Sequence, residues 1–252
     1  MSSPSAERPL GAAISKRAQL AVAGQADRGI PTREESAPDR TLIESLRHHL
    51  LAGETHYPER PGMSVLRKRI GERLPAIGYA PRATDEVLVT TSEGESLLVT
   101  LLGLKMVPGG FLKAQRGGRH QLLLDWLGVH SGPDIRTDTP ASFACYQEAG
   151  SLLGPGSMSS EAESTPMIDA IGDLLFSEQY SSNLPPEALN EHPNAIVIGN
   201  LAGLPGLDRF SLGFVTADTE TLQEITKWKQ ASSICSPAPS QRAALWALGV
   251  RP

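Results

Sequence analysis

The sequence predicts an α/β fold with a mainly parallel sheet. Three short runs rich in apolar and β-branched residues, at 85–91, 194–200 and 210–217, are typical of buried strands. Stretches with apolar residues at helical spacing precede, separate and follow these runs, and such alternation favours parallel strands joined by helices. The chain has 252 residues, of which 40% are hydrophobic, enough for one large core or two modest domains.

Two helices are expected before the first strand. One begins at Asp39, a residue type that caps helices well, and ends at Gly53. The other begins near Ser64, after a loop. Their apolar stripes consist of Leu42, Leu46 and Leu50 in the first helix, and of Leu66, Ile70 and Leu74 in the second.

The remaining elements follow the first strand in order. The strand at 85–91 turns into a helix over 96–107 that ends before Pro108, which gives a strand–turn–helix unit. Asp218 or Thr219 is expected to cap a later helix. The other expected elements are a short helix within 119–130, a strand that begins near 166, a helix over 220–230 and a last helix over 240–248.

Two segments are expected to differ from this regular pattern. Residues 1–35 are rich in Ser, Ala, Pro and charge, and we expect an N-terminal arm that is flexible in part. Residues 36–252 would form the folded domain. The Gly- and Ser-rich stretch at 152–166 predicts a flexible loop.

Composition and motifs argue against several classes of function. The net charge is −5 and no long Lys/Arg run occurs, so neither nucleic acid nor a membrane is an expected partner. No signal-peptide core and no run of 18 apolar residues occurs, which predicts a cytoplasmic protein. Cys145 and Cys235 lie far apart, and neither H-x-x-x-H nor C-x-x-C spacing occurs, so no metal site is expected. A G-x-S-x-G elbow and a G-x-G-x-x-G turn after a strand are also missing.

Several motifs resemble the class I/II aminotransferases, the fold type I enzymes that use pyridoxal 5'-phosphate (PLP). "GETHYPERPGMSVLRKRIGERL" is similar to their G-x-x-x-Y loop and the helix after it, and "VLVTTSEGES" to their strand ending in T-S-G-A. "IDAIGDLLF" resembles their S-D-E-V-Y-x-D-L-x-F segment. "IGNLAGLPGLDRFSLGFV" resembles the lysine-bearing segment S-x-S-K followed by G-L-P-G-L-R-x-G-Y. The order and rough spacing agree from Gly29 to Leu248, with a divergent or shortened stretch at 110–166.

The resemblance implies an architecture and an assembly. The expected fold is a three-layer α/β arrangement like the large domain of these enzymes, without their C-terminal small domain. Those enzymes are homodimers with sites at the subunit interface. We expect a homodimer here as well, because a sheet of this size without its small domain would otherwise expose apolar surface.

The resemblance also assigns cofactor-binding roles to residues at matching positions. Asp169 falls on the carboxylate that pairs with the pyridine nitrogen, although a turn aspartate at a strand end would look the same. Tyr57 falls on the tyrosine that reaches the partner's cofactor phosphate, although it could equally be a loop aromatic packed on a neighbour. The phosphate loop would consist of Thr91, Ser92 and Gly94, and Asn200 and Arg209 are further candidates for binding the cofactor.

Other positions depart from the family pattern. Gly203 stands where the family has the lysine that forms the Schiff base, and glycine offers no amine. Gly172 replaces the tyrosine that contacts the phenolic oxygen of the cofactor, and Ser211 replaces the phosphate arginine. Glu93 stands where the phosphate loop has glycine, with Glu95 two residues further on. Two carboxylates suit a helix N-terminus but oppose a phosphate there, unless they point away.

These features lead to three hypotheses. The favoured one is a degenerate aminotransferase-like protein without catalytic residues, which binds PLP weakly or not at all and could retain a small amino-acid-like ligand. The second is an active PLP-dependent aminotransferase with a displaced lysine among Lys105, Lys113, Lys227 and Lys229. The third is a scaffolding or interaction protein on the same fold.

Overall fold

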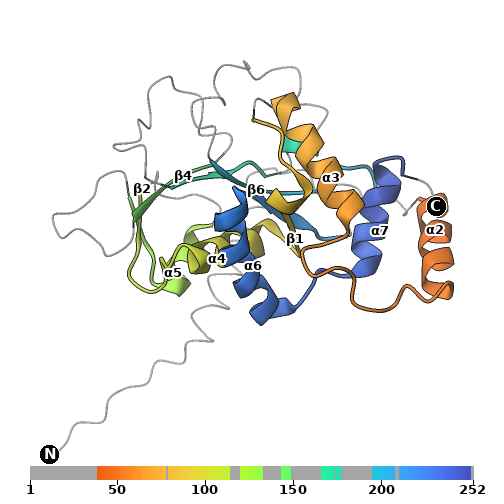
Figure 1. Ribbon diagram of the computed structural model, residues 1–252, viewed down its shortest axis with the longest axis horizontal. Coiled ribbons are helices and arrows are strands. Elements are labelled where there is room, and N and C mark those ends of the chain that lie inside the picture. Colours follow the sequence, from red (N-terminus) through yellow and green to blue (C-terminus); the bar gives the residue numbers. More distant parts are fainter. Residues whose placement is uncertain are drawn as a thin grey trace, which may run out of the picture. The chain divides into compact units, whose positions relative to one another are not determined.

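A seven-stranded sheet forms the centre of the described structure (Figure 1). The computed structural model describes residues 39–77, 79–113, 120–132, 143–148, 166–172, 174–176, 195–207 and 210–250. The strand order is β1-β7-β6-β5-β4-β2-β3. The strands are β1 (Val87–Thr90), β2 (Phe111–Lys113), β3 (His130–Gly132), β4 (Phe143–Glu148), β5 (Met167–Ala170), β6 (Ile196–Asn200) and β7 (Gly213–Thr216).

Most neighbouring strands of the sheet are parallel. From β3 through β2, β4 and β5 to β6 every pair runs in the same direction. β7 is antiparallel to both of its neighbours, with Gly213 paired to Thr90 of β1 and to Asn200 of β6. The carboxyl ends of β1, β5 and β6 and the start of β7 therefore meet at one edge of the sheet.

Helices cover both faces of this sheet (Figure 1). One core cluster joins the sheet to three helices, α2 (Arg40–Leu51), α3 (Ser64–Arg73) and α7 (Ala238–Ala247). A second cluster joins the opposite face to α4 (Glu93–Gly103), α5 (Gln121–Leu127) and α6 (Thr219–Ser233). Three short 3-10 helices complete the described elements, namely η1 (Leu74–Ile77), η2 (Thr84–Glu86) and η3 (Leu174–Phe176). This is the three-layer, mainly parallel α/β fold that the sequence predicts.

The strands bury side chains on both faces, which explains their continuous apolar runs. In β1, Val87 and Val89 belong to the cluster under α2, α3 and α7, whereas Leu88 belongs to the cluster under α4, α5 and α6. All three side chains are fully buried. Because side chains alternate between the faces of a strand, a run without polar residues requires a helix layer on each side.

Two predicted helix starts are confirmed by their capping contacts. The Asp39 carboxylate accepts a hydrogen bond from the backbone amide of Thr41 at 2.7 Å, and α2 begins at Arg40, directly after Asp39. The Asp218 carboxylate accepts from the amide of Thr221 at 2.9 Å and caps α6. Each carboxylate satisfies a backbone donor that the first helical turn leaves open.

Other boundaries differ from the predicted ones. The helix expected over 96–107 begins earlier, at Glu93, because Ser92 caps it. It ends at Gly103. β1 and β7 are shorter than the runs that predicted them, at four residues each. The sequence does not predict β2, β3 and β4, all within the stretch that diverges from the aminotransferase pattern. The expected arm at 1–35 and the expected loop at 152–166 lie outside the described residues, apart from Pro166 at its end.

None of the described helices is both long and apolar enough to cross a membrane.

Candidate functional site

The candidate site lies at the sheet edge where β1, β5 and β6 end and β7 begins. Ligands of open α/β sheets bind at the carboxyl ends of parallel strands, where loops and helix N-termini converge. Ser92 and Gly94 follow β1, Asp169 lies in β5 and Asn200 ends β6. The fold thus brings together four of the residues that the sequence predicts for a cofactor site.

The turn from β1 into α4 is held by its own side chains. The hydroxyl of Ser92 accepts a hydrogen bond from the amide of Glu95 at 3.1 Å and thereby caps α4. The hydroxyl of Ser211 donates to the carbonyl of Thr91 at 2.6 Å, which ties the start of β7 to the turn. A Cβ atom at Gly213 would lie 2.4 Å from the backbone of Ser92, so the turn and β7 approach as closely as only glycine allows.

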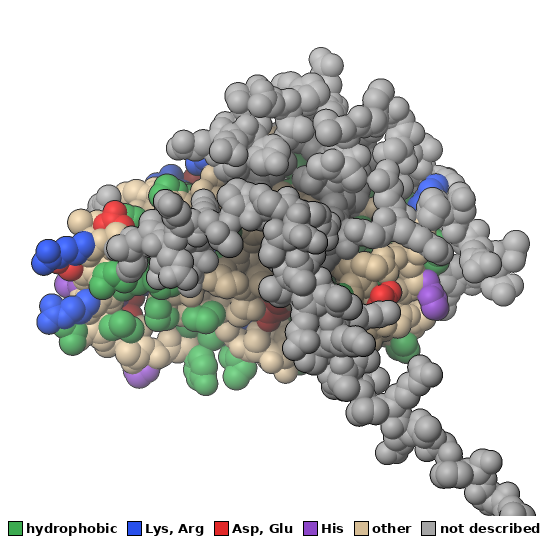
Figure 2. All heavy atoms as spheres, turned by 180° about the vertical axis from the view of Figure 1, so that it is seen from behind, with side chains coloured by type: hydrophobic (Ala, Val, Ile, Leu, Met, Phe, Trp, Pro, Cys, Tyr) green, Lys and Arg blue, Asp and Glu red, His purple; other side chains and the backbone are tan. Residues whose placement is uncertain are grey.

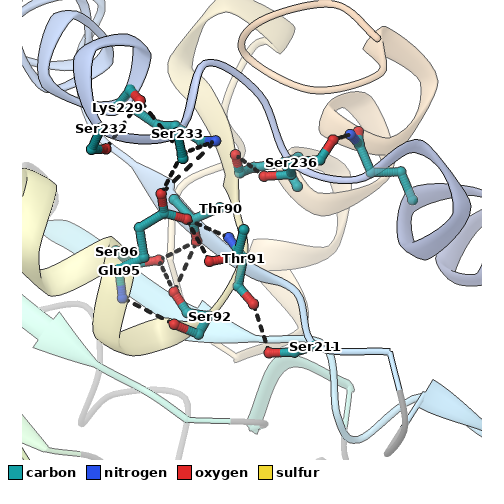
Figure 3. A network of polar contacts seen from close by, with 12 residues as sticks. Thr90, Thr91, Ser92, Glu95, Ser96, Ser211, Lys229, Ser232, Ser233 and Ser236 are labelled. Carbon is teal, nitrogen blue, oxygen red and sulfur yellow. Dashed lines mark hydrogen bonds and ion pairs between the residues drawn. The ribbon is translucent and has the colours of Figure 1, made fainter. Parts of the chain in front are cut away.

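Glu95 points away from the sheet edge, into a polar network between α4 and α6 (Figure 3). One carboxylate oxygen accepts from the amide and hydroxyl of Thr91, at 2.6 and 2.8 Å. The other accepts from the hydroxyl of Ser233 at 2.6 Å and lies 3.9 Å from the amine of Lys229, whose side chain is fully buried. Burial raises the pKa of Glu95, but the hydrogen bonds from Ser233 and Thr91 and the charge of Lys229 outweigh it, so that its pKa falls below 4.5.

Glu93 points the other way, toward the ends of β5 and β6. One carboxylate oxygen accepts from the backbone amide of Gly172 at 3.1 Å, and the other from the side-chain amide of Asn200 at 3.2 Å. The carbonyl oxygen of the Asn200 side chain accepts from the amide of Ala202 at 3.0 Å, which turns the NH₂ group toward Glu93. Only 7% of Glu93 is exposed. An anion of the chain itself therefore lies among the donors of this edge.

Asp169 is buried and forms a hydrogen bond with a residue that the sequence does not single out. The hydroxyl of Tyr79 donates to the Asp169 carboxylate at 2.9 Å. Burial raises the pKa of Tyr79, and so does the charge of Asp169, which keeps the hydroxyl protonated as a donor. Tyr79 follows η1 and shares the core cluster of α2, α3 and α7. Nothing in its local pattern marks it, because the contact spans 90 positions of the chain.

The structure does not place the remaining predicted site residues in this cluster. Tyr57 lies in the loop between α2 and α3 with 78% of its surface exposed, and its predicted contact with a partner subunit stays a prediction. Arg209 lies outside the described residues. Gly203 is half-buried in the loop after β6 and supplies no side chain. Among the described residues, no group of three His, Cys, Asp or Glu side chains could hold a metal ion.

The residues at this edge do not fit the phosphate group of PLP. The carboxylate of Glu93 takes the donors of Gly172 and Asn200, and the hydroxyl of Ser211 already donates to the carbonyl of Thr91. Each additional negative charge at about 4 Å from a carboxylate would be repelled by roughly 4 kcal/mol near a protein surface. Asp169, by contrast, is the buried carboxylate that a protonated pyridine ring would require.

Comparisons with known proteins identify the fold. No family model and no curated protein matches the chain. A Methanococcus jannaschii protein, described as similar in its active site to kynurenine aminotransferases, is 20% identical with a TM-score of 0.67, over 92% of this chain and 68% of that one. Thermus thermophilus aspartate aminotransferase is 15% identical with a TM-score of 0.67, over 98% and 73% of the two chains.

A third structure gives a similar picture. N-succinyldiaminopimelate aminotransferase from Mycobacterium tuberculosis is 19% identical with a TM-score of 0.63, over 86% of this chain and 63% of that one. The chain therefore spans roughly two thirds of the length of these proteins, and at these identities the likeness concerns the fold. The structure has the mainly parallel α/β fold of the aminotransferase large domain, as the sequence predicts.

Proposed function

We propose that this chain is an aminotransferase-like protein without transaminase activity, which binds PLP weakly or not at all. Gly203 carries the proposal, because it occupies the position of the Schiff-base lysine in the resembling segment. A glycine neither forms a covalent bond to the cofactor aldehyde nor shuttles the α-proton of an amino acid. The carboxylate of Glu93, which bonds to Gly172 and Asn200, supports the proposal independently, because it puts a negative charge at the start of the helix where the resemblance places the cofactor phosphate.

Three of the four alternative lysines are poorly placed to replace the missing one. Lys229 is fully buried between α6 and α4, and its amine donates to Ser233 at 2.8 Å. Lys227 is exposed and paired with Glu224 on the surface of α6. Lys105 follows the far end of α4, and the 11 residues of this helix place it about 16 Å from the turn at Ser92.

Lys113 is the lysine that gives the active alternative its support. It ends β2 at the level of Cys145 in β4 and Met167 in β5. Residues at one level of a sheet share a face, so Lys113 lies on the same face as Asp169, two residues further along β5. Two strand spacings of about 4.8 Å separate β2 from β5. A PLP-dependent reaction through Lys113 is therefore the second candidate function.

The test is to incubate the purified full chain with PLP, record the absorption spectrum, treat with borohydride and map adducts by mass spectrometry. The proposal expects no lysine-linked chromophore and no adduct that is specific to one lysine. An adduct confined to Lys113, and lost in a Lys113→Met variant, would establish the second candidate. An adduct at another single lysine would also contradict the proposal.

A scaffolding role is separated from ligand binding by a thermal-shift titration. A retained pocket is expected to raise the melting temperature with PLP or with free amino acids, because a ligand that binds the folded state stabilises it. An unchanged melting temperature with both ligands would favour a scaffolding protein that binds its partners through its surface.

A further inference from the structure

Glu93 is an internal anion held by the same kinds of group that bind phosphate in proteins. It is the first residue of α4, and its carboxylate accepts from the backbone amide of Gly172 and the side-chain amide of Asn200. Gly172 follows β5 and Asn200 is the last residue of β6, so these donors come from the ends of two different strands. Amide donors around a helix N-terminus form a cradle that stabilises a negative charge. Here the negative charge is the carboxylate of Glu93, a residue of the chain itself.

We propose that Glu93 closes this anion cradle, and that replacing Glu93 opens it to the phosphate group of an external ligand. The inference rests on the proposed function, because the resemblance places the cofactor phosphate at this edge. Beyond the proposed function, it names Glu93 as the residue that excludes phosphate and predicts that phosphate binds once this residue is replaced. In the natural chain the cradle rejects phosphates, so a ligand of this edge carries no anionic group there.

The neighbouring contacts give Glu93 one stable position. Asn200 is oriented by the hydrogen bond from Ala202 to its carbonyl oxygen, so that its NH₂ group faces the carboxylate. Gly172 has a φ of 62°, a left-handed conformation that presents its amide to Glu93. The carboxylate is buried with 7% of the residue exposed. An external phosphate would have to displace this side chain and occupy the same donors.

Glu95 does not share this role, although it lies only two residues further on. Its carboxylate bonds to Thr91 and Ser233 on the side of α6, and Lys229 balances its charge. The two carboxylates of the first turn of α4 therefore point to opposite sides of this turn, Glu93 toward β5 and β6 and Glu95 toward α6. Only the removal of Glu93 is expected to change the binding of anions.

The experiment compares three full-length variants with the natural chain. Glu93→Gly removes the carboxylate and its volume, whereas Glu93→Gln keeps the shape and removes the charge. Glu220→Gly is the matched control, since it deletes a carboxylate from the first turn of another helix, α6. The probes are inorganic phosphate, PLP and pyridoxal, which lacks the phosphate group. Melting temperature and calorimetric titration give the affinities.

Phosphate and PLP are expected to bind Glu93→Gly at least about tenfold more tightly than the natural chain, which corresponds to 1.4 kcal/mol. At saturating phosphate, its melting temperature should rise by about 2–4 °C. Glu93→Gln should gain less than Glu93→Gly. Glu220→Gly should behave like the natural chain, and pyridoxal should bind all four proteins equally.

Equal phosphate binding by the natural chain and Glu93→Gly would overturn the inference, as would an equal gain in Glu220→Gly. If Glu93→Gly does not fold, Glu93→Gln decides, since a gain supports the inference and no gain overturns it. The proposed function fails differently, through a borohydride-trapped lysine adduct in the natural chain. A chain can fail one test and pass the other, so the two failures are distinguishable.

Discussion

The hydrogen bond between Tyr79 and Asp169 is a buried polar contact of the candidate site. Both residues are less than 8% exposed. A buried carboxylate is costly unless it is hydrogen-bonded, so Tyr79 contributes to the stability of the site even if no ligand binds. The contact also fixes the carboxylate at the end of β5, where the resemblance expects a partner for a pyridine ring.

Replacing Tyr79 by Phe is therefore expected to destabilise the fold by about 1–3 kcal/mol, since the carboxylate loses a buried donor. Urea unfolding of the two proteins measures the difference. Tyr57→Phe is the matched control, because its ring is 78% exposed and its change should stay within about 0.5 kcal/mol. An equal effect of the two substitutions would show that the hydroxyl of Tyr79 contributes nothing specific.

At the scale of single residues, the sequence predicts where a site residue lies in the fold better than it predicts which residues its side chain contacts. The resemblance places Asp169 and Asn200 at the edge where the structure has them, and it marks Glu93 and Glu95 as departures. The directions of the two glutamates, one into the edge and one away from it, depend on partners 79 to 138 positions away. Local spacing carries no information on such partners.

The turn between β1 and α4 is the element on which the site is built, and two glycines test its packing. A Cβ atom at Gly213 would lie 2.4 Å from the backbone of Ser92, whereas a Cβ atom at Gly94 would meet only the hydroxyl of Ser92 at 3.7 Å. Gly213→Ala is expected to destabilise by at least about 1–3 kcal/mol through overpacking. Gly94→Ala should stabilise by about 0.5–1 kcal/mol, since alanine favours helices. Chemical denaturation measures both changes in stability. If both substitutions stabilised the fold, or both destabilised it, the packing described for this turn would be contradicted.

The network between α4 and α6 predicts a pH dependence. The pKa of Glu95 is lower in the folded state than its ordinary value of 4.5, so the carboxylate stabilises the fold above that pH. This stabilisation is lost as the pH falls from 4.5 through the lower folded value. Glu95→Gln should cost about 1–3 kcal/mol at pH 7 and progressively less below pH 4.5. Denaturant midpoints over a pH series measure this, and a cost independent of pH would refute it.

Helices were easier to predict than short strands. Capping residues and apolar stripes mark helices directly, as Asp39 and Asp218 show at α2 and α6. β2 and β3 have three residues each, which is too short for alternation to be visible in the sequence. These strands exist because β4 and its neighbours continue the sheet, which is a tertiary effect.

At the scale of the whole molecule, α2 carries apolar residues on two faces. Leu42 and Leu46 are buried against the core shared with α7, as their spacing predicts. Ile43, Leu50 and Leu51 are instead 43%, 43% and 74% exposed. Figure 2 shows hydrophobic side chains exposed beside basic ones at the left of the molecule. Grouped apolar side chains on a surface mark interaction sites more often than isolated ones do.

We expect the exposed face of α2 to contribute to a homodimer. Changing both Ile43 and Leu50 to Glu should weaken self-association at least about 100-fold, since charges would enter an apolar contact. Sedimentation velocity over a concentration series measures the change, and circular dichroism should show that the helices remain. Leu122→Glu on α5, where the leucine is 47% exposed, is the control that should leave the dimer intact. A natural chain that stays monomeric at about 100 µM, far above the dissociation constants of stable dimers, would contradict the expectation.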